Sequence, residues 1–430
     1  MDRYIVVGGN RLSGTVRMSG AKNAILPVMA ATVLTPGDHL IRDVPRLRDV
    51  EVMKEILEAL GARVQPEEGG RSLLVNTDGL NASEIPEDLM REMRSSIFLM
   101  GALLGRMGQV RCCHPGGCAI GSRDIDLHLM GLGALGADIH EKYGYINASA
   151  GRLVGREIYL DLPSVGATEN IMMAAVLAEG TTIVRNAAKE PEIVDLQNFL
   201  NGLGARIKGA GLDVIRIDGV TQLHPGEHTV IPDRIETGTF MVAAAIARGE
   251  VEIENVIAEH VEAITAKLRE TGATVRVEKD RVVVSADRRA RAVDFKTLPY
   301  PGFPTDMQPQ MMALMCTADG TSIITETIFE NRFKAADELR RMGADVKVEG
   351  RSAIIKGVPR LSSAAVEGPA LREGVALVLA ALTADGVTTV EGVHHIERGY
   401  EALEQKLASL GADITRETWR EPRPVRQYAG

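Results

Sequence analysis

The sequence predicts an α/β protein of six repeated units, in which buried helices lie inside and sheets lie outside. Three observations predict this fold: two sets of regularly spaced glycines, helices that are apolar on nearly every face, and strands that alternate apolar with charged residues. Six units divide naturally into three plus three, so we expect two similar domains of about 200 residues each.

A Gly-Ala pair that ends one helix and precedes a strand marks each repeat. Its glycines are Gly61, Gly136, Gly204, Gly272, Gly343 and Gly411, with neighbours 68 to 75 residues apart. A second set closes six apolar segments, 23 to 28 residues before the matching member of the first set: Gly37, Gly108, Gly180, Gly249, Gly320 and Gly386. Two glycine sets in phase six times indicate a repeated structural unit.

Each unit is predicted to contain an apolar helix, a glycine stop, a short strand, an amphipathic helix, the Gly-Ala pair and one or two further strands. The apolar helices carry apolar or small residues on nearly every face, so we expect them to be buried all round. The clearest are residues 171–177, 241–246, 311–315 and 375–382. The segment 275–284 alternates apolar with charged residues, as a strand with one solvated face does. These strands disfavour an α-solenoid.

Composition and charge limit the partners. The formal charge of −9 argues against a general binder of nucleic acid or acidic membranes, and favours small molecules. We predict a cytoplasmic protein, because there is no signal-like N-terminus and no apolar run approaches the ~18 residues that span a bilayer. The four cysteines, Cys112, Cys113, Cys118 and Cys316, are too few and too bunched for a disulfide framework and lack a zinc pattern, so we expect no metal. The oligomeric state cannot be inferred from these features.

Seven short motifs occur in a characteristic order along the chain. They are Ser19-Gly-Ala-Lys-Asn-Ala24, Pro115-Gly-Gly-Cys-Ala-Ile-Gly-Ser-Arg123, Pro163-Ser-Val-Gly-Ala-Thr168, Pro232-Asp-Arg-Ile-Glu-Thr-Gly238, Phe303-Pro-Thr-Asp306, Phe329-Glu-Asn-Arg-Phe333 and Arg398-Gly-Tyr400. Together they resemble the UDP-N-acetylglucosamine enolpyruvyl transferase family. The resemblance implies an inside-out α/β barrel with one domain at residues 22–231 and another at residues 1–21 plus 232–430.

The resemblance also implies the reaction. Such an enzyme transfers the enolpyruvyl group of phosphoenolpyruvate to the 3′-hydroxyl of UDP-N-acetylglucosamine and releases phosphate, which opens peptidoglycan precursor synthesis. No metal or organic cofactor is expected. Between them the two substrates carry a carboxylate, a phosphate and a diphosphate, so the site needs concentrated positive charge. Cations at helix starts can supply it, although most arginines at helix ends are solvated or form weak surface pairs.

The resemblance assigns residues to both substrates. The phosphoenolpyruvate site is implied to comprise Lys22, Asn23, Arg123, Arg372 and Arg398. The UDP-N-acetylglucosamine site is implied to comprise Arg94, Arg123, Asp124, Ile125, Asp126, Leu127, Ser164, Val165, Gly166, Asp306 and Ile328. Arg332 is expected near the same helix starts, either beside the substrates or as a partner of Glu330.

Two residues are candidates for proton transfer. Cys118 lies in a glycine-rich loop rather than an apolar run, and the resemblance implies that it is the general acid toward C3 of the enolpyruvyl group and the target of fosfomycin. Asp306 begins a buried helix, where a capping carboxylate is the commoner use, and the resemblance makes it the base for the sugar hydroxyl. Glu236 is expected to be structural or supporting, and His128 and Glu169 to be satisfied polar groups.

Two other functions agree less well with the sequence. The related enolpyruvyl transferase that uses shikimate 3-phosphate should have a Ser-Lys-Ser start and lack the Gly-Gly-Cys loop, whereas this chain reads Gly-Ala-Lys-Asn and has the loop. A paralogue that binds UDP-sugar and regulates without turnover is disfavoured because Lys22, Cys118, Asp306 and Arg398 are all retained. One departure from the family is Ala370, where many members carry Asp.

Overall fold

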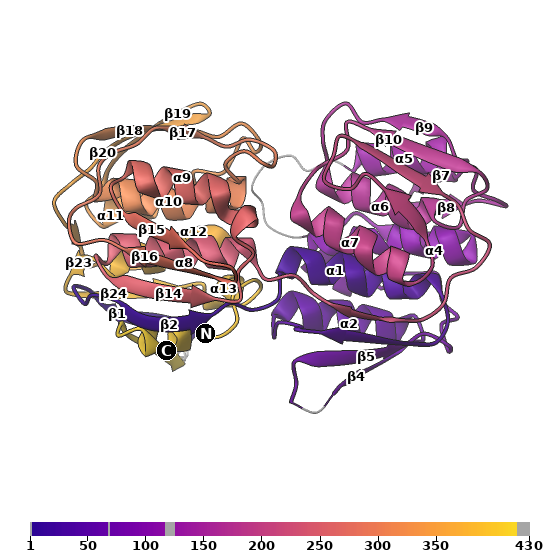
Figure 1. The fold of residues 1–430 in the computed structure, drawn as a ribbon, viewed down its shortest axis with the longest axis horizontal. Coiled ribbons are helices and arrows are strands. Elements are labelled where there is room, and N and C mark those ends of the chain that lie inside the picture. Colours follow the sequence, from indigo (N-terminus) through magenta and orange to yellow (C-terminus); the bar gives the residue numbers. More distant parts are fainter. Residues whose placement is uncertain (1, 68, 117–124, 419–430) are drawn as a thin grey trace, which may run out of the picture.

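The buried side chains form two separate hydrophobic clusters, one in each of the two lobes seen in Figure 1. The computed structural model describes residues 2–67, 69–116 and 125–418. One cluster draws on residues 21–230, and the other on residues 4–18 and 235–414. The indigo N-terminal strands therefore pack with the orange and yellow C-terminal half of the chain (Figure 1).

The described residues of the first lobe form three sheets. Their strand orders are β13-β3-β5-β4, β6-β8-β7 and β11-β12-β10-β9. The strands are β3 (Asp38–Arg42), β4 (Arg63–Pro66), β5 (Ser72–Asn76), β6 (Gln109–Cys113), β7 (Asp138–Lys142), β8 (Tyr145–Ser149), β9 (Glu157–Tyr159), β10 (Thr181–Arg185), β11 (Arg206–Lys208), β12 (Val214–Asp218) and β13 (Glu227–Thr229). The helices are α1 (Lys22–Ala31), α2 (Arg48–Ala59), α3 (Glu87–Glu92), α4 (Leu99–Met107), α5 (Asp126–Ala134), α6 (Val165–Ala175) and α7 (Pro191–Gly202), with 3₁₀ turns η1 (Thr32–Leu34) and η2 (Arg94–Phe98).

The second lobe has the orders β15-β16-β14-β2, β17-β18-β20-β19 and β22-β24-β1-β25, and a β21-β23 pair. The strands are β1 (Asp2–Val7), β2 (Ser13–Arg17), β14 (Glu250–Glu254), β15 (Thr274–Val277), β16 (Arg281–Ser285), β17 (Phe295–Lys296), β18 (Thr321–Thr325), β19 (Asp345–Glu349), β20 (Ser352–Lys356), β21 (Leu361–Ser362), β22 (Ala365–Glu367), β23 (Ala384–Asp385), β24 (Val387–Glu391) and β25 (Asp413–Thr418). The helices are α8 (Arg234–Ile246), α9 (Glu262–Glu270), α10 (Gln308–Cys316), α11 (Ala335–Arg341), α12 (Leu371–Ala381), α13 (Val393–Ile396) and α14 (Leu403–Ser409), with 3₁₀ turns η3 (Ala258–Val261) and η4 (Thr305–Met307).

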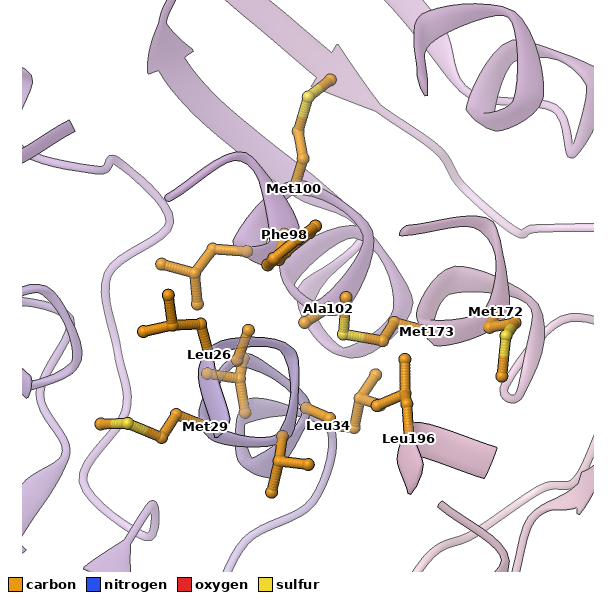
Figure 2. Close-up of a cluster of buried hydrophobic side chains, with 14 of the residues drawn as sticks. Leu26, Met29, Leu34, Phe98, Met100, Ala102, Met172, Met173 and Leu196 are labelled. Carbon is orange, nitrogen blue, oxygen red and sulfur yellow. The ribbon is translucent and has the colours of Figure 1, made fainter. Parts of the chain in front are cut away.

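Three of the four segments predicted to be buried all round lie in fully buried helices, whereas the fourth, 171–177, extends past the end of α6 (Val165–Ala175) and Leu177 is half-buried. Every residue of α8, α10 and α12 is buried, because their apolar and small residues cover most of the helix circumference. In the first lobe, Figure 2 shows Met29 of α1, Ala102 of α4, Met173 of α6 and Leu196 of α7 in one apolar cluster. The segment 275–284 is a hairpin of β15 and β16 rather than a single strand.

The six Gly-Ala pairs end six helices in the same way. In each pair the alanine N–H donates to a carbonyl five residues earlier, at 3.0–3.2 Å: Ala62 to Leu57, Ala137 to Leu132, Ala205 to Leu200, Ala273 to Leu268, Ala344 to Leu339 and Ala412 to Leu407. The preceding glycines have φ between +84° and +102°. This is the Schellman arrangement, which needs a left-handed residue and therefore favours glycine.

The chain crosses between the lobes along two adjacent segments. Ala21 N–H donates to the Ile231 carbonyl at 2.8 Å, and Asp233 N–H donates to the Ser19 carbonyl at 2.9 Å. Both α1 and α8 begin within a few residues of this double crossing, so its geometry fixes the starts of two buried helices, one in each lobe. Among the described residues, no helix combines the length and apolar character needed to cross a membrane.

Candidate active site

Asp49 binds two of the predicted donor-site cations at once. Lys22 is the first residue of α1, and its Nζ lies 2.9 Å from Asp49 Oδ2. Arg398 follows α13 in the other lobe, and its Nε and Nη2 contact Asp49 Oδ1 and Oδ2 at 2.8 and 3.2 Å. Asn23, the other predicted residue at this helix start, is half-buried. The structure therefore brings Lys22 and Arg398 together across the two lobes.

Asp306 is held between two buried arginines. Its Oδ1 lies 3.0 Å from Arg332 Nη2, and its Oδ2 accepts from Arg372 Nη2 at 3.1 Å and Nε at 3.3 Å. Burial alone would raise the pKa of Asp306, but the charges of Arg372, Arg332 and Lys22 hold that pKa well below its usual range. Asp306 is therefore an ion-paired carboxylate in this structure, and its side chain makes no capping bond to the helix that follows.

Arg332 lies close to two carboxylates. Besides Asp306, its guanidinium lies 3.4 Å from Glu373 Oε1, and both side chains are buried. Glu373 and Arg372 both belong to the first turn of α12. The contacts of Asp306 with Arg372, and of Arg332 with Asp306 and Glu373, therefore connect the η4 turn to the start of that helix.

Arg372 is positioned from its other side by an aromatic ring. Its guanidinium lies 5.3 Å from the centre of the Tyr400 ring, and the Tyr400 hydroxyl is 2.7 Å from Thr239 Oγ1 and 3.2 Å from Gln310 Nε2. These polar contacts are buried, and they join α8, α10 and α12 at one end. Burial alone would lower the pKa of Arg372, but Tyr400 and Asp306 raise it, so the guanidinium stays charged.

Asp233 connects the starts of the two buried helices at the crossing. Its Oδ1 accepts from the N–H groups of Ile235 and Glu236 at 2.8 and 2.9 Å, which caps α8. Its Oδ2 accepts from the Lys22 backbone N–H at 3.2 Å. Asp233 was not among the predicted site residues, although an Asp directly before an apolar helix is a cap signature that could have identified it.

The predicted nucleotide side is a second meeting point of helix starts, in the first lobe. Ser164 caps α6, and its Oγ accepts from Ala167 N–H at 3.3 Å. Gly166 leaves room for the His128 ring, since a Cβ there would lie 3.0 Å from it. Asn170 Nδ2 lies 2.9 Å from His128 Nδ1, so His128 is a satisfied polar group as predicted. The other predicted residues here are Val165 in the first turn of α6, buried Ile125 before α5, and Asp126 and Leu127 in the first turn of α5.

Arg94 and Ile328 lie at the ends of other elements. Arg94 is half-buried and begins the η2 turn ahead of α4. Ile328 follows β18, where its N–H donates to Glu326 Oε1 at 2.8 Å. Glu326 also accepts from Thr305 Oγ1 at 2.9 Å, so the Ile328 loop is fixed against the turn that carries Asp306.

Three predicted residues, Cys118, Arg123 and Asp124, lie outside the described residues. The other cysteines are buried, and burial raises the pKa of the Cys112 and Cys316 thiols to about 12. In the described ranges, no group of three or more His, Cys, Asp or Glu side chains is arranged to hold a metal ion.

A second buried ion pair joins the two lobes. Arg234 of α8 donates through Nε to Glu192 of α7 at 2.9 Å.

Glu169, predicted to be satisfied, has no hydrogen-bond partner for either carboxylate oxygen within the described part of the chain. Its pKa is raised well above the usual range by burial, and further by Glu192 and Glu190. Glu236 lies 2.6 Å from Lys406, which agrees with a structural role.

Known enolpyruvyl transferases match the chain over almost all of its length. Residues 6–407 match the family model EPSP synthase (3-phosphoshikimate 1-carboxyvinyltransferase). UDP-N-acetylglucosamine 1-carboxyvinyltransferase 1 of Symbiobacterium thermophilum is 66% identical over 421 residues, covering 96% of this chain and 95% of that protein. The chain belongs to the UDP-N-acetylglucosamine 1-carboxyvinyltransferase family. This confirms the resemblance carried by the seven motifs.

Other relatives agree with this family. UDP-N-acetylglucosamine 1-carboxyvinyltransferase 2 of Caldanaerobacter subterraneus subsp. tengcongensis is 55% identical, over 97% of this chain and all of that protein. Among solved structures, the enolpyruvyl transferase NikO from Streptomyces tendae superposes with a TM-score of 0.89 at 28% identity, covering 97% of this chain and 99% of that one. The EPSP synthase of Acinetobacter baumannii has a TM-score of 0.76 at 18% identity and shares the fold. The predicted α/β class is therefore that of the enolpyruvyl transferases.

Proposed function

We propose that this transferase moves the enolpyruvyl group of phosphoenolpyruvate to the 3′-hydroxyl of UDP-N-acetylglucosamine and releases phosphate. The observation that carries the proposal is the gathering of Lys22, Arg372 and Arg398 around two carboxylates, Asp49 and Asp306. Family membership at 66% identity supports the same reaction. In the cell, this reaction would open peptidoglycan precursor synthesis in the cytoplasm.

The architecture that we propose for this reaction is the inside-out barrel of six units. Its domains would be residues 22–231 and residues 1–21 plus 232–430. Two separate hydrophobic clusters and the double crossing near Gly20 and Pro232 support these limits. Closure of the two domains over the substrates would exclude water from the reaction.

The donor would bind through charge. Lys22, Asn23, Arg123, Arg372 and Arg398 would hold the phosphate and carboxylate of phosphoenolpyruvate. Arginine matches both groups with paired hydrogen bonds, and lysine supplies a compact charge. The charges of the buried Arg372 and of the largely buried Lys22 and Arg398 are little screened by salt, so their attraction for the donor would be strong.

The acceptor would lie over the helix starts of the first lobe. The Ser164-Val165-Gly166 turn at the N-terminus of α6 presents backbone N–H groups suited to a diphosphate. Arg94 would add positive charge, and Arg123, Asp124, Ile125, Asp126 and Leu127 would contact the uridine. Asp306 and Ile328 would contact the sugar from the second lobe.

The reaction that fits these residues is addition followed by elimination. The 3′-oxygen forms a bond to C2 of phosphoenolpyruvate as its proton passes to Asp306, and Cys118 gives a proton to C3. In the elimination, C3 returns a proton to the Cys118 thiolate, the bond between C2 and the phosphate oxygen breaks, the proton held by Asp306 passes to the leaving phosphate, and the vinyl ether forms. The cations stabilise the charge that develops as phosphate leaves.

The contacts of Asp306 add a condition to this mechanism. A carboxylate that holds two arginines is a weak base, since protonation must break favourable ion pairs. If the donor draws Arg372 toward its own anionic groups, Asp306 keeps one partner fewer and its basicity rises. Asp306 would then act as a base only when phosphoenolpyruvate is bound.

Phosphate release tests this function against its alternatives. The protein should release phosphate from phosphoenolpyruvate only when UDP-N-acetylglucosamine is present. Release that required shikimate 3-phosphate would favour the other enolpyruvyl transferase activity. UDP-sugar binding without any release would favour a regulatory paralogue.

A further inference from the structure

The Asp49 carboxylate lies at a contact between the lobes. It is the second residue of α2, and its side chain is buried. The preceding residue, Arg48, donates its backbone N–H to the carbonyl of Glu397 in the other lobe at 3.2 Å. The next residue in that lobe is Arg398, whose guanidinium binds both oxygens of Asp49. Backbone and side chain together therefore fix Arg398 against the start of α2.

Asp49 also holds the first-lobe cation. Lys22 Nζ and Arg398 Nη2 both contact Oδ2 of Asp49. Two cations that share one carboxylate oxygen would repel each other if that carboxylate were removed. The paired contact further sets the plane of the Arg398 guanidinium, because a carboxylate binds the planar fork in a defined orientation.

We propose that Asp49 is a positioning residue for the phosphoenolpyruvate site, which holds Arg398 of one lobe beside Lys22 of the other. This inference rests on the function proposed above, because it takes Lys22 and Arg398 as donor-binding cations. Asp49 contributes through them rather than by touching the reacting atoms. It remains charged at neutral pH: burial alone would raise its pKa, but Lys22 and Arg398 lower that pKa.

An alternative role for Asp49, neutralising the cations, predicts the opposite change in donor binding. If Asp49 only neutralised the cations, it would compete with the anionic donor, and its removal would tighten donor binding. If Asp49 positions the cations, its removal lets them separate, and donor binding weakens. The direction of the change in KM for phosphoenolpyruvate therefore distinguishes the two roles.

The experiment compares Asp49→Asn, Asp49→Ala and Asp49→Glu with the matched control Asp195→Asn. Asp195 is equally buried, and its Oδ1 lies 3.0 Å from His228 Nε2, but both partners lie in the first lobe. Steady-state phosphate release gives KM for each substrate, and thermal unfolding reports on the fold. We expect the Asn and Ala variants to raise KM for phosphoenolpyruvate about tenfold or more, the loss of ~1.4 kcal/mol or more of binding. KM for UDP-N-acetylglucosamine should stay within about twofold, since the nucleotide side keeps its contacts.

Two further results are expected. Asp49→Glu, which keeps the charge, should recover part of the lost donor affinity. Asp195→Asn should lower the unfolding temperature and leave both KM values near those of the unmodified protein. An unchanged or lowered KM for phosphoenolpyruvate in Asp49→Asn would overturn the proposal. So would equal increases in both KM values, or failure of all three Asp49 variants to fold. If the unmodified protein releases no phosphate with both substrates present, it is the proposed function that fails.

Discussion

The Asp306 carboxylate accepts two hydrogen bonds from the Arg372 guanidinium, at 3.1 and 3.3 Å, although 66 residues separate them in the sequence. Asp306 lies in the turn before α10, and Arg372 lies in the first turn of α12. The proposed base and a proposed donor-binding cation are thus partners before any substrate arrives. A donor that engages Arg372 would therefore change the environment of the base.

Replacement of Asp306 tests its role as the base. Asp306→Asn should lower kcat by roughly 10²- to 10⁴-fold, the usual contribution of general base catalysis. The variant also leaves Arg332 and Arg372 with a neutral partner, so thermal unfolding should accompany the rate measurement. Asp319→Asn, an exposed acid paired with Arg289, serves as the control. A near-normal rate in Asp306→Asn would leave that side chain a structural ion-pair partner only.

Arg372→Lys tests whether geometry matters in addition to charge. Lysine keeps the positive charge, but it cannot make the two-nitrogen contact with Asp306 or reproduce the guanidinium contact with the Tyr400 ring. We expect KM for phosphoenolpyruvate to rise about tenfold, the loss of ~1.4 kcal/mol of binding. Arg341→Lys, at an exposed pair with Glu338, should leave the kinetics unchanged. Equal KM values in both variants would show that charge alone suffices at position 372.

The proposed role of Cys118 as the general acid can be tested by substitution and by chemical modification. Cys118→Ala should abolish turnover while UDP-N-acetylglucosamine still binds in a calorimetric titration. Fosfomycin should add one adduct to the intact mass of the unmodified protein and none to Cys118→Ala, because the other three thiols are buried. Turnover that survives in Cys118→Ala would remove Cys118 as the general acid.

The buried carboxyl of Glu169 should make the stability of the folded protein depend on pH. The pKa of this acid is raised in the folded protein, so the folded state binds its proton more tightly than the unfolded state does. The destabilisation that comes from ionising buried Glu169 is absent below its pKa in the unfolded state, about 4.5. It grows as the pH rises toward the pKa in the folded state. Glu169→Gln should therefore raise the unfolding temperature at pH 8 and leave it nearly unchanged at pH 4. An equal effect of Glu169→Gln at both pH values would mean that ionisation of Glu169 is not the cause.

Much of the fold could be predicted because the signals are local. Residues 241–246, 311–315 and 375–382 are apolar on every face, and each lies in a helix that is buried throughout. The Gly-Ala pairs likewise act within one helix end. The hairpin at 275–284 was missed although its four consecutive charged residues, 278–281, interrupt the alternating pattern at the point where the chain turns.

The site was predicted less completely, because its key contacts join distant segments. Motifs identified Lys22, Asp306 and Arg398 as candidates, and the family resemblance added Arg372 at a helix start, but no local pattern pairs Asp49 with Arg398, 349 residues later. The same holds for the Arg332 contact with Asp306, because the sequence left Arg332 either beside the substrates or as a partner of Glu330. The pairing of each carboxylate with its cation depends on how the helix starts of different units come together in the folded protein.

The most direct test of the central claim is a single-turnover reaction followed by product analysis. The protein is mixed with phosphoenolpyruvate and UDP-N-acetylglucosamine, and both the phosphate and the mass of the nucleotide sugar are measured. The account predicts one phosphate released for each UDP-N-acetylglucosamine that gains an enolpyruvyl group, and neither product when the acceptor lacks its 3′-hydroxyl. Phosphate released without a heavier nucleotide sugar, or released equally with the 3′-deoxy acceptor, would contradict it.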